Sequence, residues 1–224
     1  RGLPTIFVSE WLKKSVEKSL LMKIDNYRII PNPIDGDLFQ YKENDGDKSN
    51  ELLSIRPFRP KYANKQTIRA VAEVDDVHLD LYGKGPMKDE LQQLADQLDA
   101  NVDIHEEFFT QDEIASLHRD YGVYVTPSKS DAQGVSMCEA MSSGIPVISS
   151  PVQAIPEFVV DGETGFLCDG PPEIAEKIRY FRDNPQSVIK MGKRASEFIR
   201  EKSGADYVVE QDLSVAKSLV RTNG

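Results

Sequence analysis

The stretch DAQGVSMCEAMSSGIPVISS, residues 131–150, decides the fold of this chain. It follows an apolar run over residues 123–128 that is typical of a buried strand ending in a turn. Residues 135–143 are predicted to form a helix, which Gly144 ends because glycine readily adopts the left-handed backbone of a helix C-terminus. A second strand over residues 145–149 completes the unit. A doubly wound sheet uses this order of strand, glycine loop, helix and strand to form an anion site at a helix N-terminus.

Two acidic residues of this stretch lie close to the expected anion site. Asp131 is in the loop, and Glu139 lies about 6–8 Å into the helix at roughly 1.5 Å per residue. Helical side chains lean toward the N-terminus, so we expect the Glu139 carboxylate to point back toward the anion. An acid about one diphosphate length from a phosphate pocket suits a ribose diol, and a second acid at the pocket mouth suits sugar hydroxyls. The two acids therefore indicate a site for a nucleotide sugar.

The composition argues against several other classes of protein. A net charge of −10 at pH 7 argues against a nucleic-acid partner and against docking of this region on anionic lipid by charge alone. The two cysteines, Cys138 and Cys168, give neither a disulfide framework nor a metal site, which favours a reducing cytoplasm. No run of about 18 apolar residues occurs. Because the opening RGLPTIFVSEW lacks a methionine and enters a strand almost at once, we expect a fragment of a longer protein.

Strands and helices alternate along the chain. Apolar runs predict strands over residues 5–8, 27–30, 52–56, 77–82, 102–105, 123–128 and 145–149. Helical patterns follow most of them, over residues 10–22, 65–74, 87–98, 111–121, 135–143 and 172–184, with one or two more helices over 185–220. This alternation with short connections predicts a parallel sheet with helices on both faces. The polar stretch over residues 43–50 is the best candidate for a domain boundary.

Several segments, taken in order and at approximate spacing, resemble motifs of one known family. The segments are IIPNPIDGDLF (29–39), SIRPFRPK (54–61), LYGKGP (81–86), EEFFTQDEIASLHRDYGVYVTPS (106–128), DAQGVSMCEAMSSGIPVI (131–148) and IPEFVVDGETGFL (155–167). On them the chain resembles the C-terminal, donor-binding half of a retaining glycosyltransferase of the GT-B fold, in the "glycosyl transferases group 1" family. The resemblance implies an α/β fold with a Rossmann-like parallel sheet.

The resemblance also implies a division of the chain and a reaction. Residues 1–44 are expected to be the end of an N-terminal domain and the crossover, residues 45–205 the nucleotide-sugar-binding domain, and residues 206–224 a helix packing back toward the N-terminal domain. The full enzyme is expected to move a hexose-type sugar from a nucleotide diphosphate to a glycan or lipid-linked acceptor in polysaccharide biosynthesis. Since the acceptor site would belong to the missing N-terminal half, this fragment alone is expected to be inactive. The implied localisation is cytoplasmic, and a peripheral position at the inner membrane face stays open for the full enzyme.

The family's paired acids correspond to Asp131 and Glu139, which stand at the family's spacing. The resemblance implies that Glu139 contacts the ribose hydroxyls and that Asp131, shorter than the usual glutamate by one methylene, faces the transferred sugar. The backbone N–H groups of Gly134, Val135 and Ser136 are expected to donate to the phosphates. Alternatives remain for these residues. Asp131 also suits a turn former, and Gly134 an ordinary loop hinge. Ser136 also suits a cap of the first helical turn, and Glu139 taken alone would suit an exposed helical acid.

Arg56 and Lys61 match an arginine and a lysine that the family places five residues apart in one loop. The resemblance implies that they neutralise the diphosphate as it leaves, where fixed cations contribute most to a transition state. Ile55 and Tyr62 stand where the family usually has glycine, and this puts the conformation of the loop in question. Arg59 is an additional cation that also suits the surface.

Two further loops carry weaker candidates for donor binding. Gly83 and Gly85 lie in a loop that the family places near the nucleotide, although a tight turn between strand and helix explains them equally. Phe109, with Phe108 before it, lies where the family's backbone meets the edge of the base. Apolar residues that plug the end of the sheet are the alternative for these two phenylalanines.

We expect no cofactor other than the nucleotide-sugar substrate and no required metal. The three histidines, His78, His105 and His118, have no carboxylate or cysteine partner at metal-ligand spacing in the sequence. They are therefore expected to be structural.

Two other functions stay open beside the transferase. A nucleotide-sugar 2-epimerase has the same two-domain architecture, but the order of the segments over residues 29–39, 54–61 and 131–148 favours the transferase. A non-catalytic nucleotide-sugar-binding module is favoured only by Asp131 in place of the usual glutamate.

Overall fold

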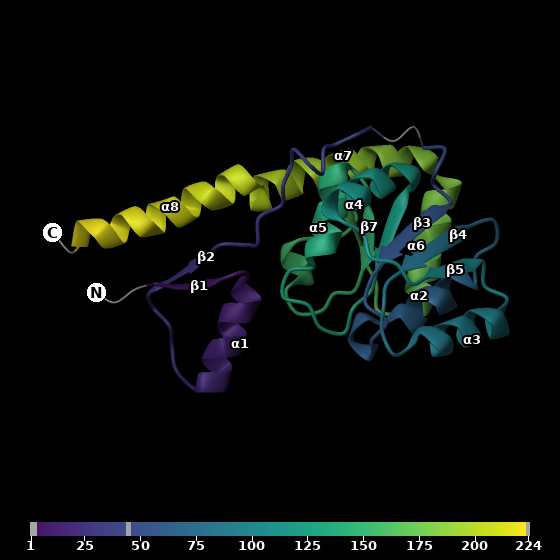
Figure 1. Cartoon of the computed structure of the whole chain (residues 1–224), viewed down its shortest axis with the longest axis horizontal. Coiled ribbons are helices and arrows are strands. Elements are labelled where there is room, and N and C mark those ends of the chain that lie inside the picture. Colours follow the sequence, from purple (N-terminus) through teal and green to yellow (C-terminus); the bar gives the residue numbers. More distant parts are fainter. Residues whose placement is uncertain (1–3, 44–45, 223–224) are drawn as a thin grey trace.

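The structure is a computed structural model that describes residues 4–43 and 46–222 of the chain (Figure 1). Its central strands are β3 (Glu51–Ile55), β4 (His78–Tyr82), β5 (Val102–His105), β6 (Val123–Thr126), β7 (Val147–Ser149) and β8 (Gly165–Leu167). They form a six-stranded sheet in the order β5-β4-β3-β6-β7-β8, and every neighbouring pair is parallel. The parallel α/β sheet expected from the sequence is confirmed. This is the strand order of a doubly wound fold. Strands are added toward one edge from β3 to β5 and toward the other edge from β6 to β8, so the order reverses between β3 and β6.

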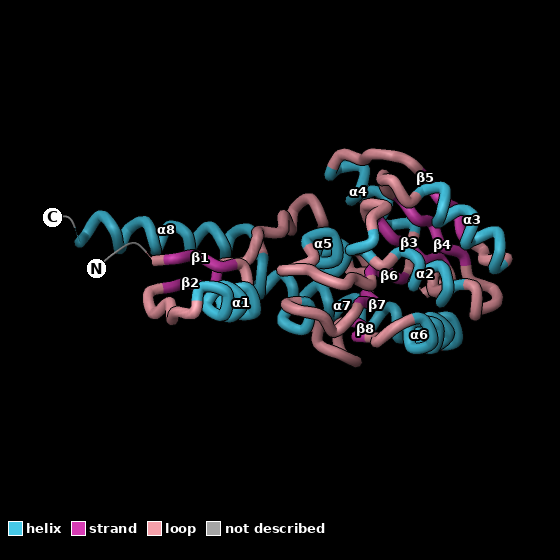
Figure 2. Tube along the Cα trace, turned by 90° about the horizontal axis from the view of Figure 1, so that it is seen from below, coloured by secondary structure: helices cyan, strands magenta, loops and turns pink. Residues whose placement is uncertain are grey.

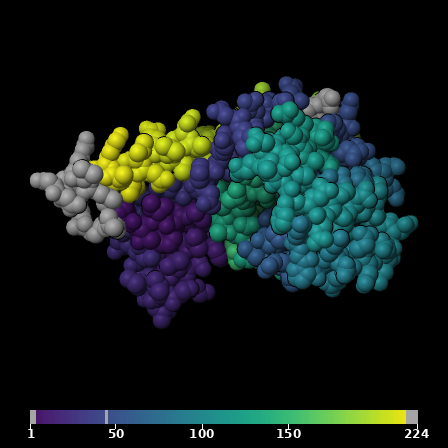
Figure 3. Space-filling view, in the orientation of Figure 1, coloured from purple at the N-terminus to yellow at the C-terminus, as the bar shows by residue number. Residues whose placement is uncertain are grey.

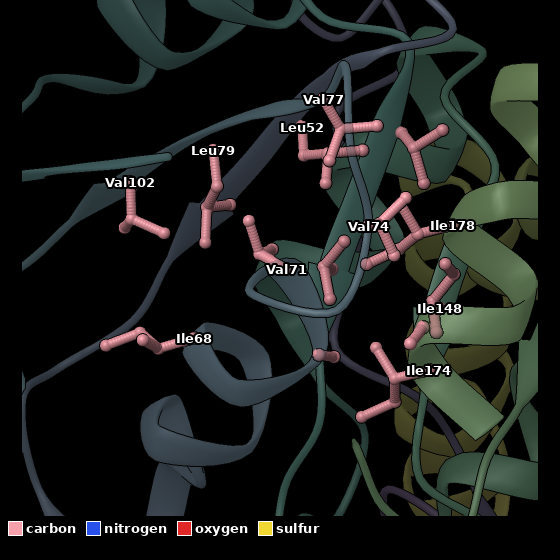
Figure 4. Close-up of a cluster of buried hydrophobic side chains, with 14 of the residues drawn as sticks. Leu52, Ile68, Val71, Val74, Val77, Leu79, Val102, Ile148, Ile174 and Ile178 are labelled. Atoms are coloured by element: carbon pink, nitrogen blue, oxygen red, sulfur yellow. The ribbon is translucent and has the colours of Figure 1, made fainter. Parts of the chain in front are cut away.

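Helices cover both faces of this sheet (Figure 2). They are α2 (Asn64–Val71), α3 (Lys88–Leu98), α4 (Gln111–Leu117), α5 (Val135–Ser143), α6 (Pro171–Asp183) and α7 (Pro185–Ser203). Residues of α2, α3 and α6 share one hydrophobic core with the sheet, and Figure 4 shows Ile68 and Ile174 there with strand residues. Residues of α4, α5 and the C-terminal half of α7 pack in a second core, whereas Val188 and Met191 of α7 belong to the first. The neighbours Leu52 and Leu53 of β3 lie in different cores, because successive side chains of a strand point to opposite faces.

A small unit precedes this body at the N-terminus. It consists of β1 (Thr5–Phe7), α1 (Glu10–Leu20) and β2 (Tyr27–Ile29), with the two strands paired in parallel. Ser9 caps α1, because its side chain accepts a hydrogen bond from the N–H of Leu12. The carboxylate of Glu157 accepts two more, from the backbone N–H groups of Glu10 and Trp11 at 3.0 and 2.7 Å. These bonds join α1 to the α/β body.

The last helix, α8 (Ala205–Thr222), leaves the α/β body and runs alongside the N-terminal unit (Figures 1 and 3). Gly204 separates it from α7, and the N–H of Ala205 donates to the carbonyl of Ile34 at 3.0 Å. In the described part of the chain, no helix combines the length and the apolar composition needed to cross a membrane. The division of the chain at residues 44–45 and 205–206 stays a prediction, and residues 44 and 45 lie outside the described residues.

The structure differs from the predicted elements in a few places. The short edge strand β8 was not expected, because its sequence, Gly-Phe-Leu, is too short to show a period. The helix expected over residues 111–121 ends at Leu117 and continues as a 3₁₀ turn over His118–Asp120. Short 3₁₀ turns also occur over Pro60–Tyr62 and Ile155–Glu157. The other elements begin or end within a few residues of the prediction.

The close packing of α7 on α5 gives a first testable prediction. A Cβ atom at Gly192 of α7 would overlap the carbonyl oxygen of Gly144, which ends α5. Alanine in a helix is normally better than glycine by about 0.5–1 kcal/mol. Here the overlap forces the two helices apart, so Gly192→Ala should lower the free energy of unfolding by about 1–3 kcal/mol in urea denaturation. The substitution Lys193→Ala at the exposed neighbouring position is the control. If Gly192→Ala were as stable as the parent or more stable, α7 could shift away from α5 without loss of stability.

Candidate functional site

The buried side chain of Arg56 marks the point where the strand order reverses. Arg56 directly follows β3 and is 5% exposed, and its Nε donates a hydrogen bond to the hydroxyl of Thr126 at the end of β6. Its Nη1 pairs with Oδ2 of Asp131 at 3.3 Å. Its Nη2 is buried and has no hydrogen-bond partner among the described residues. The guanidinium is thus fixed by two strands, while one of its donor groups is left unsatisfied.

Asp131 holds the loop that leads into α5. Its Oδ1 accepts hydrogen bonds from the backbone N–H of Gly134 at 2.8 Å and of Gln133 at 3.3 Å. The positive φ of Gly134, 74°, explains the glycine at this position. Asp131 therefore forms the turn that the alternative interpretation described, and it also pairs with Arg56.

The N-terminus of α5 differs from the expectation for one of its three donors. The N–H of Gly134, expected to donate to an anion, donates to Asp131 in this structure. Val135 and Ser136 form the first turn of α5, where N–H groups have no acceptor within the helix. These two groups therefore remain as the candidate phosphate donors.

The side chain of Glu139 is nearly buried on α5. Its side chain is 8% exposed, and within the described part of the chain no residue gives it a hydrogen bond or an ion pair. Burial raises the pKa of Glu139 to about 7, because the charged carboxylate has lost water without gaining donors. A buried acid of this kind is costly unless something else supplies hydrogen bonds. The carboxylate is thus ready to accept from a ligand.

The ring of Tyr62 lies beside both predicted cations. The ring centroid is 5.3 Å from Cζ of Arg56 and 5.4 Å from Nζ of Lys61, distances at which a cation and an aromatic face attract each other. The N–H of Lys129 donates to the carbonyl of Lys61 at 2.9 Å, which joins the loop after β3 to the loop after β6. An aromatic ring thus packs beside both cations at a position where the family usually has glycine.

A pocket of about 530 Å³ lies at the carboxyl ends of β3, β4 and β5. The predicted residues that line it are Arg56, Gly83, Gly85 and Phe109. Arg59 and Phe108 line it as well. Lys61 and the residues of α5 lie outside this lining. The pair between Arg56 and Asp131 connects the pocket to the loop that leads into α5.

The two glycines of the pocket permit a close approach of two loops. A Cβ atom at Gly83 would overlap the carbonyl oxygen of Arg56, and one at Gly85 would overlap the carbonyl of Phe58. The N–H of Arg56 also donates to the carbonyl of Tyr82 at 2.9 Å. The turn after β4 therefore supports the backbone that carries Arg56, which adds a physical reason to the tight turn expected from the sequence.

The two phenylalanines of the pocket have different environments. Phe109 packs edge-on against Tyr82, with ring centroids 5.1 Å apart, and so covers the end of the sheet. Phe108 is 80% exposed, and Nζ of Lys84 lies 4.2 Å from its ring centroid. The plug interpretation is therefore wrong for Phe108, whose exposed ring lies at the pocket rim beside Lys84.

Sequence reasoning missed a buried amide that joins the N-terminal segment to the site. Gln133 is 2% exposed, and its Oε1 accepts from the backbone N–H of Asn32 at 2.7 Å and from its Nδ2 at 2.9 Å. Its Nε2 donates to the carbonyl of Asn32 at 3.0 Å. Both residues stand in segments that carry the family resemblance, but they lie 101 positions apart, and no local pattern indicates the contact.

The expectation that the histidines lack carboxylate partners is wrong for two of them. Nε2 of His105 lies 2.6 Å from Asp80, and Nε2 of His78 lies 3.4 Å from the same carboxylate. The parallel pairing of β4 and β5 brings these residues together across the sheet. His118 is structural as expected, since burial lowers its pKa to about 4 and its Nδ1 bonds the hydroxyl of Ser143 at 2.9 Å.

Comparison with known proteins identifies a family and a curated relative. The family model described as "Glycosyl transferases group 1" matches residues 37–198. The curated N-acetyl-alpha-D-glucosaminyl L-malate synthase of Bacillus anthracis is 27% identical over 193 residues, which are 83% of this chain and 50% of that protein. This chain therefore spans about half the length of that relative.

Solved structures share the fold. The C-terminal domain of a glycosyl transferase group 1 family protein from Francisella tularensis superposes with a TM-score of 0.68 at 22% identity, covering 77% of this chain and 99% of that domain. The Anabaena protein HepE, in complex with UDP and glucose, superposes with a TM-score of 0.82 at 19% identity, covering 97% of this chain and 62% of that one.

The raised pKa of Glu139 predicts a stability that falls with pH. The folded protein holds this proton more tightly than the unfolded chain, so the stabilisation is complete below about pH 4.5 and is lost as the pH rises through 7. Glu139→Gln removes this loss. We compare the free energy of unfolding of the variant with that of the parent in urea denaturation. This difference should be about 1–3 kcal/mol more favourable to the variant at pH 8 than at pH 4.5. The exposed substitution Glu197→Gln is the control, and a Glu139→Gln difference that does not change with pH would mean that the carboxylate is already satisfied.

Proposed function

The chain belongs to the glycosyl transferases group 1 family, and on that premise we propose that it binds the nucleotide diphosphate of a sugar donor. The full-length protein is then a retaining transferase that moves a hexose-type sugar to a glycan or lipid-linked acceptor. This chain supplies the donor-binding part, and the acceptor site belongs to an N-terminal half outside it. We also propose that the transfer requires no metal.

The observation that carries the proposal is the nearly buried carboxylate of Glu139, which has no hydrogen-bond or ion-pair partner among the described residues. A vicinal diol donates two hydrogen bonds to one carboxylate, and bonds to a charged group contribute more than neutral ones. A ribose therefore supplies what the protein leaves out. Glu139 is proposed to hold the two ribose hydroxyls of the donor nucleotide.

The second unsatisfied group belongs to Arg56 and suits the opposite charge. Its buried Nη2 has no acceptor in the part of the chain that the structure describes, and a phosphate oxygen would provide one. Burial raises the pKa of Tyr124, with the charge of Arg56 opposing the rise and that of Glu139 adding to it. The two groups therefore lie near one buried hydroxyl, which supports a single ligand with a diphosphate at one end and a ribose at the other.

The diphosphate is where charge develops as the sugar leaves. Arg56, Lys61 and the N–H groups of Val135 and Ser136 are the donors that we propose for it, because fixed cations and helix N-termini stabilise such charge without reorganisation. The bond from the sugar to the diphosphate oxygen breaks through an oxocarbenium-like state. Its electron pair stays on that oxygen, and these groups stabilise the negative charge that develops on the diphosphate. Gly83, Gly85 and Phe109 are proposed to hold the nucleoside beside them.

We propose two roles for Asp131, which are to position the groups that bind the diphosphate and to contact the transferred sugar. Its two oxygens are taken here by Arg56 and by the loop before α5. It therefore positions the guanidinium and the helix end that act on the diphosphate. The contact with sugar hydroxyls implied by the resemblance stays a proposal of its own.

UDP is the first nucleotide to test, because the HepE structure contains UDP and glucose. Calorimetric titration with UDP and with uridine separates the two ends of the site. Glu139→Ala should weaken UDP and uridine by a similar factor of about 10–150, since its loss removes charge-assisted bonds worth about 1.5–3 kcal/mol to the ribose. An unchanged affinity of this variant for both ligands would remove Glu139 from the ribose site.

Lys61→Ala should weaken UDP by about tenfold or more and leave uridine nearly unchanged, because it removes a cation from the diphosphate alone. Arg56→Ala should show the same selectivity, and its thermal unfolding must be measured in parallel because its ion pair with Asp131 is largely buried. Lys193→Ala removes an exposed cation from α7 and is the matched control. Equal losses for UDP and uridine would place the two cations away from the phosphates.

A further inference from the structure

One face of β4 and β5 carries a ladder of polar side chains that the proposed function does not use. In the register of these strands Asp80 lies directly beside Asp103, on the face opposite to the core residues Leu79 and Leu81. Two carboxylates side by side on neighbouring strands repel each other. Such a pair calls for a cation between or beside them.

His78 is the nearest group that can answer this charge. It lies two residues before Asp80 on β4 and therefore on the same face. Its Nε2 lies 3.4 Å from Oδ2 of Asp80 and 3.6 Å from Oδ2 of Asp103. One nitrogen and two carboxylate oxygens thus converge, and all three atoms lie within 4.8 Å of one another.

The opposite nitrogen of His78 sets its tautomer. Nδ1 lies 3.3 Å from Oδ1 of Asn101, and Nδ2 of Asn101 donates to the carbonyl of Val77 at 2.8 Å. The second bond orients the amide, so the oxygen of Asn101 faces Nδ1, which must then carry a hydrogen and donate. In a neutral imidazole Nε2 therefore carries no hydrogen, and its lone pair faces two carboxylate oxygens. A metal ion converts this repulsive arrangement into a set of ligands.

We propose that His78, Asp80 and Asp103 bind a divalent transition-metal ion, with Zn²⁺ as the best fit. Zinc takes imidazole nitrogen and carboxylate oxygen at about 2.0–2.2 Å in tetrahedral geometry, which places neighbouring ligand atoms about 3.3–3.5 Å apart. The two distances from Nε2, 3.4 and 3.6 Å, are close to that separation. Water fills the fourth position, because Asp103 is 70% exposed and leaves the site open. Magnesium fits less well, since it prefers six oxygen ligands.

The groups around these ligands hold them in place. Asp80 accepts hydrogen bonds from Nε2 of His105 and from the hydroxyl of Tyr121, each at 2.6 Å. Such partners orient a metal-binding carboxylate and the imidazole beside it. His78 begins β4, whereas the proposed nucleotide pocket lies beyond its carboxyl end. The ion therefore joins the edge strand β5 to β4 and has a structural role separate from sugar transfer.

The test is zinc binding to the metal-free chain, measured by calorimetry and by thermal unfolding. The proposal predicts uptake of one Zn²⁺ per chain and a melting temperature that rises with zinc concentration. His78→Gln and Asp103→Asn should each weaken zinc binding at least tenfold. Asp89→Asn is the matched control, because it removes the same charge from an exposed position on α3. Both Asp89→Asn and the parent should bind zinc equally.

Nitrogen NMR of the His78 ring gives a readout that does not depend on folding energy. Zinc should move Nε2 to the shift of a metal-bound nitrogen while Nδ1 keeps its hydrogen. A ring that carries hydrogens on both nitrogens at pH 7 and stays so in excess zinc would overturn the proposal, because the imidazolium would then be the cation for the two carboxylates. Absence of saturable zinc uptake, or uptake that survives both substitutions, would overturn it as well.

Discussion

The buried ion pair between Arg56 and Asp131 is the interaction on which the site depends. It crosses the point where the strand order reverses, so it ties the loop after β3 to the loop that enters α5. The other carboxylate oxygen of Asp131 accepts a hydrogen bond from the N–H of Gly134, and this bond positions the first turn of the helix. Removing either partner would leave the other charge with little access to water. For a buried pair this lowers the free energy of unfolding by about 3–5 kcal/mol. One pair of side chains thus sets both the cation and the helix end.

Neighbouring loops bring further support to this pair from elements far apart in the chain. Gly83 allows the turn after β4 to touch the backbone of Arg56, and Tyr62 places its ring beside the guanidinium. Gln133 binds both the backbone and the side chain of Asn32, so the crossover from the N-terminal unit is fastened to the same loop. The site is therefore assembled by loops, but each loop is held by a rigid strand or helix end.

Local patterns in the sequence predicted the elements well and the contacts poorly. The helix Val135–Ser143 was predicted to the residue, because a glycine stands at each end, whereas the three residues of β8 are too few to show a period. Topology alone predicts that the side chains that follow parallel strands meet at one edge of the sheet. On this ground Arg56 is expected near the loop after β6. Topology does not predict an ion pair 75 positions apart, nor the pairing of Asp80 with His105, which depends on the register of two strands. The role of Gly83 as a contact with Arg56 is hidden for the same reason.

The carboxylate of Glu139 has no donors among the described residues, and the proposed ligand supplies them. The most direct test is the pKa of the Glu139 carboxyl group, measured by carbon NMR in the free protein and with saturating nucleotide. The free value should lie at about 7. Hydroxyl donors favour the charged form, so the bound value should fall toward the ordinary range for glutamate. A pKa that stays at about 7 in the nucleotide complex would contradict the account, because the carboxylate would then have gained no donors from the ligand.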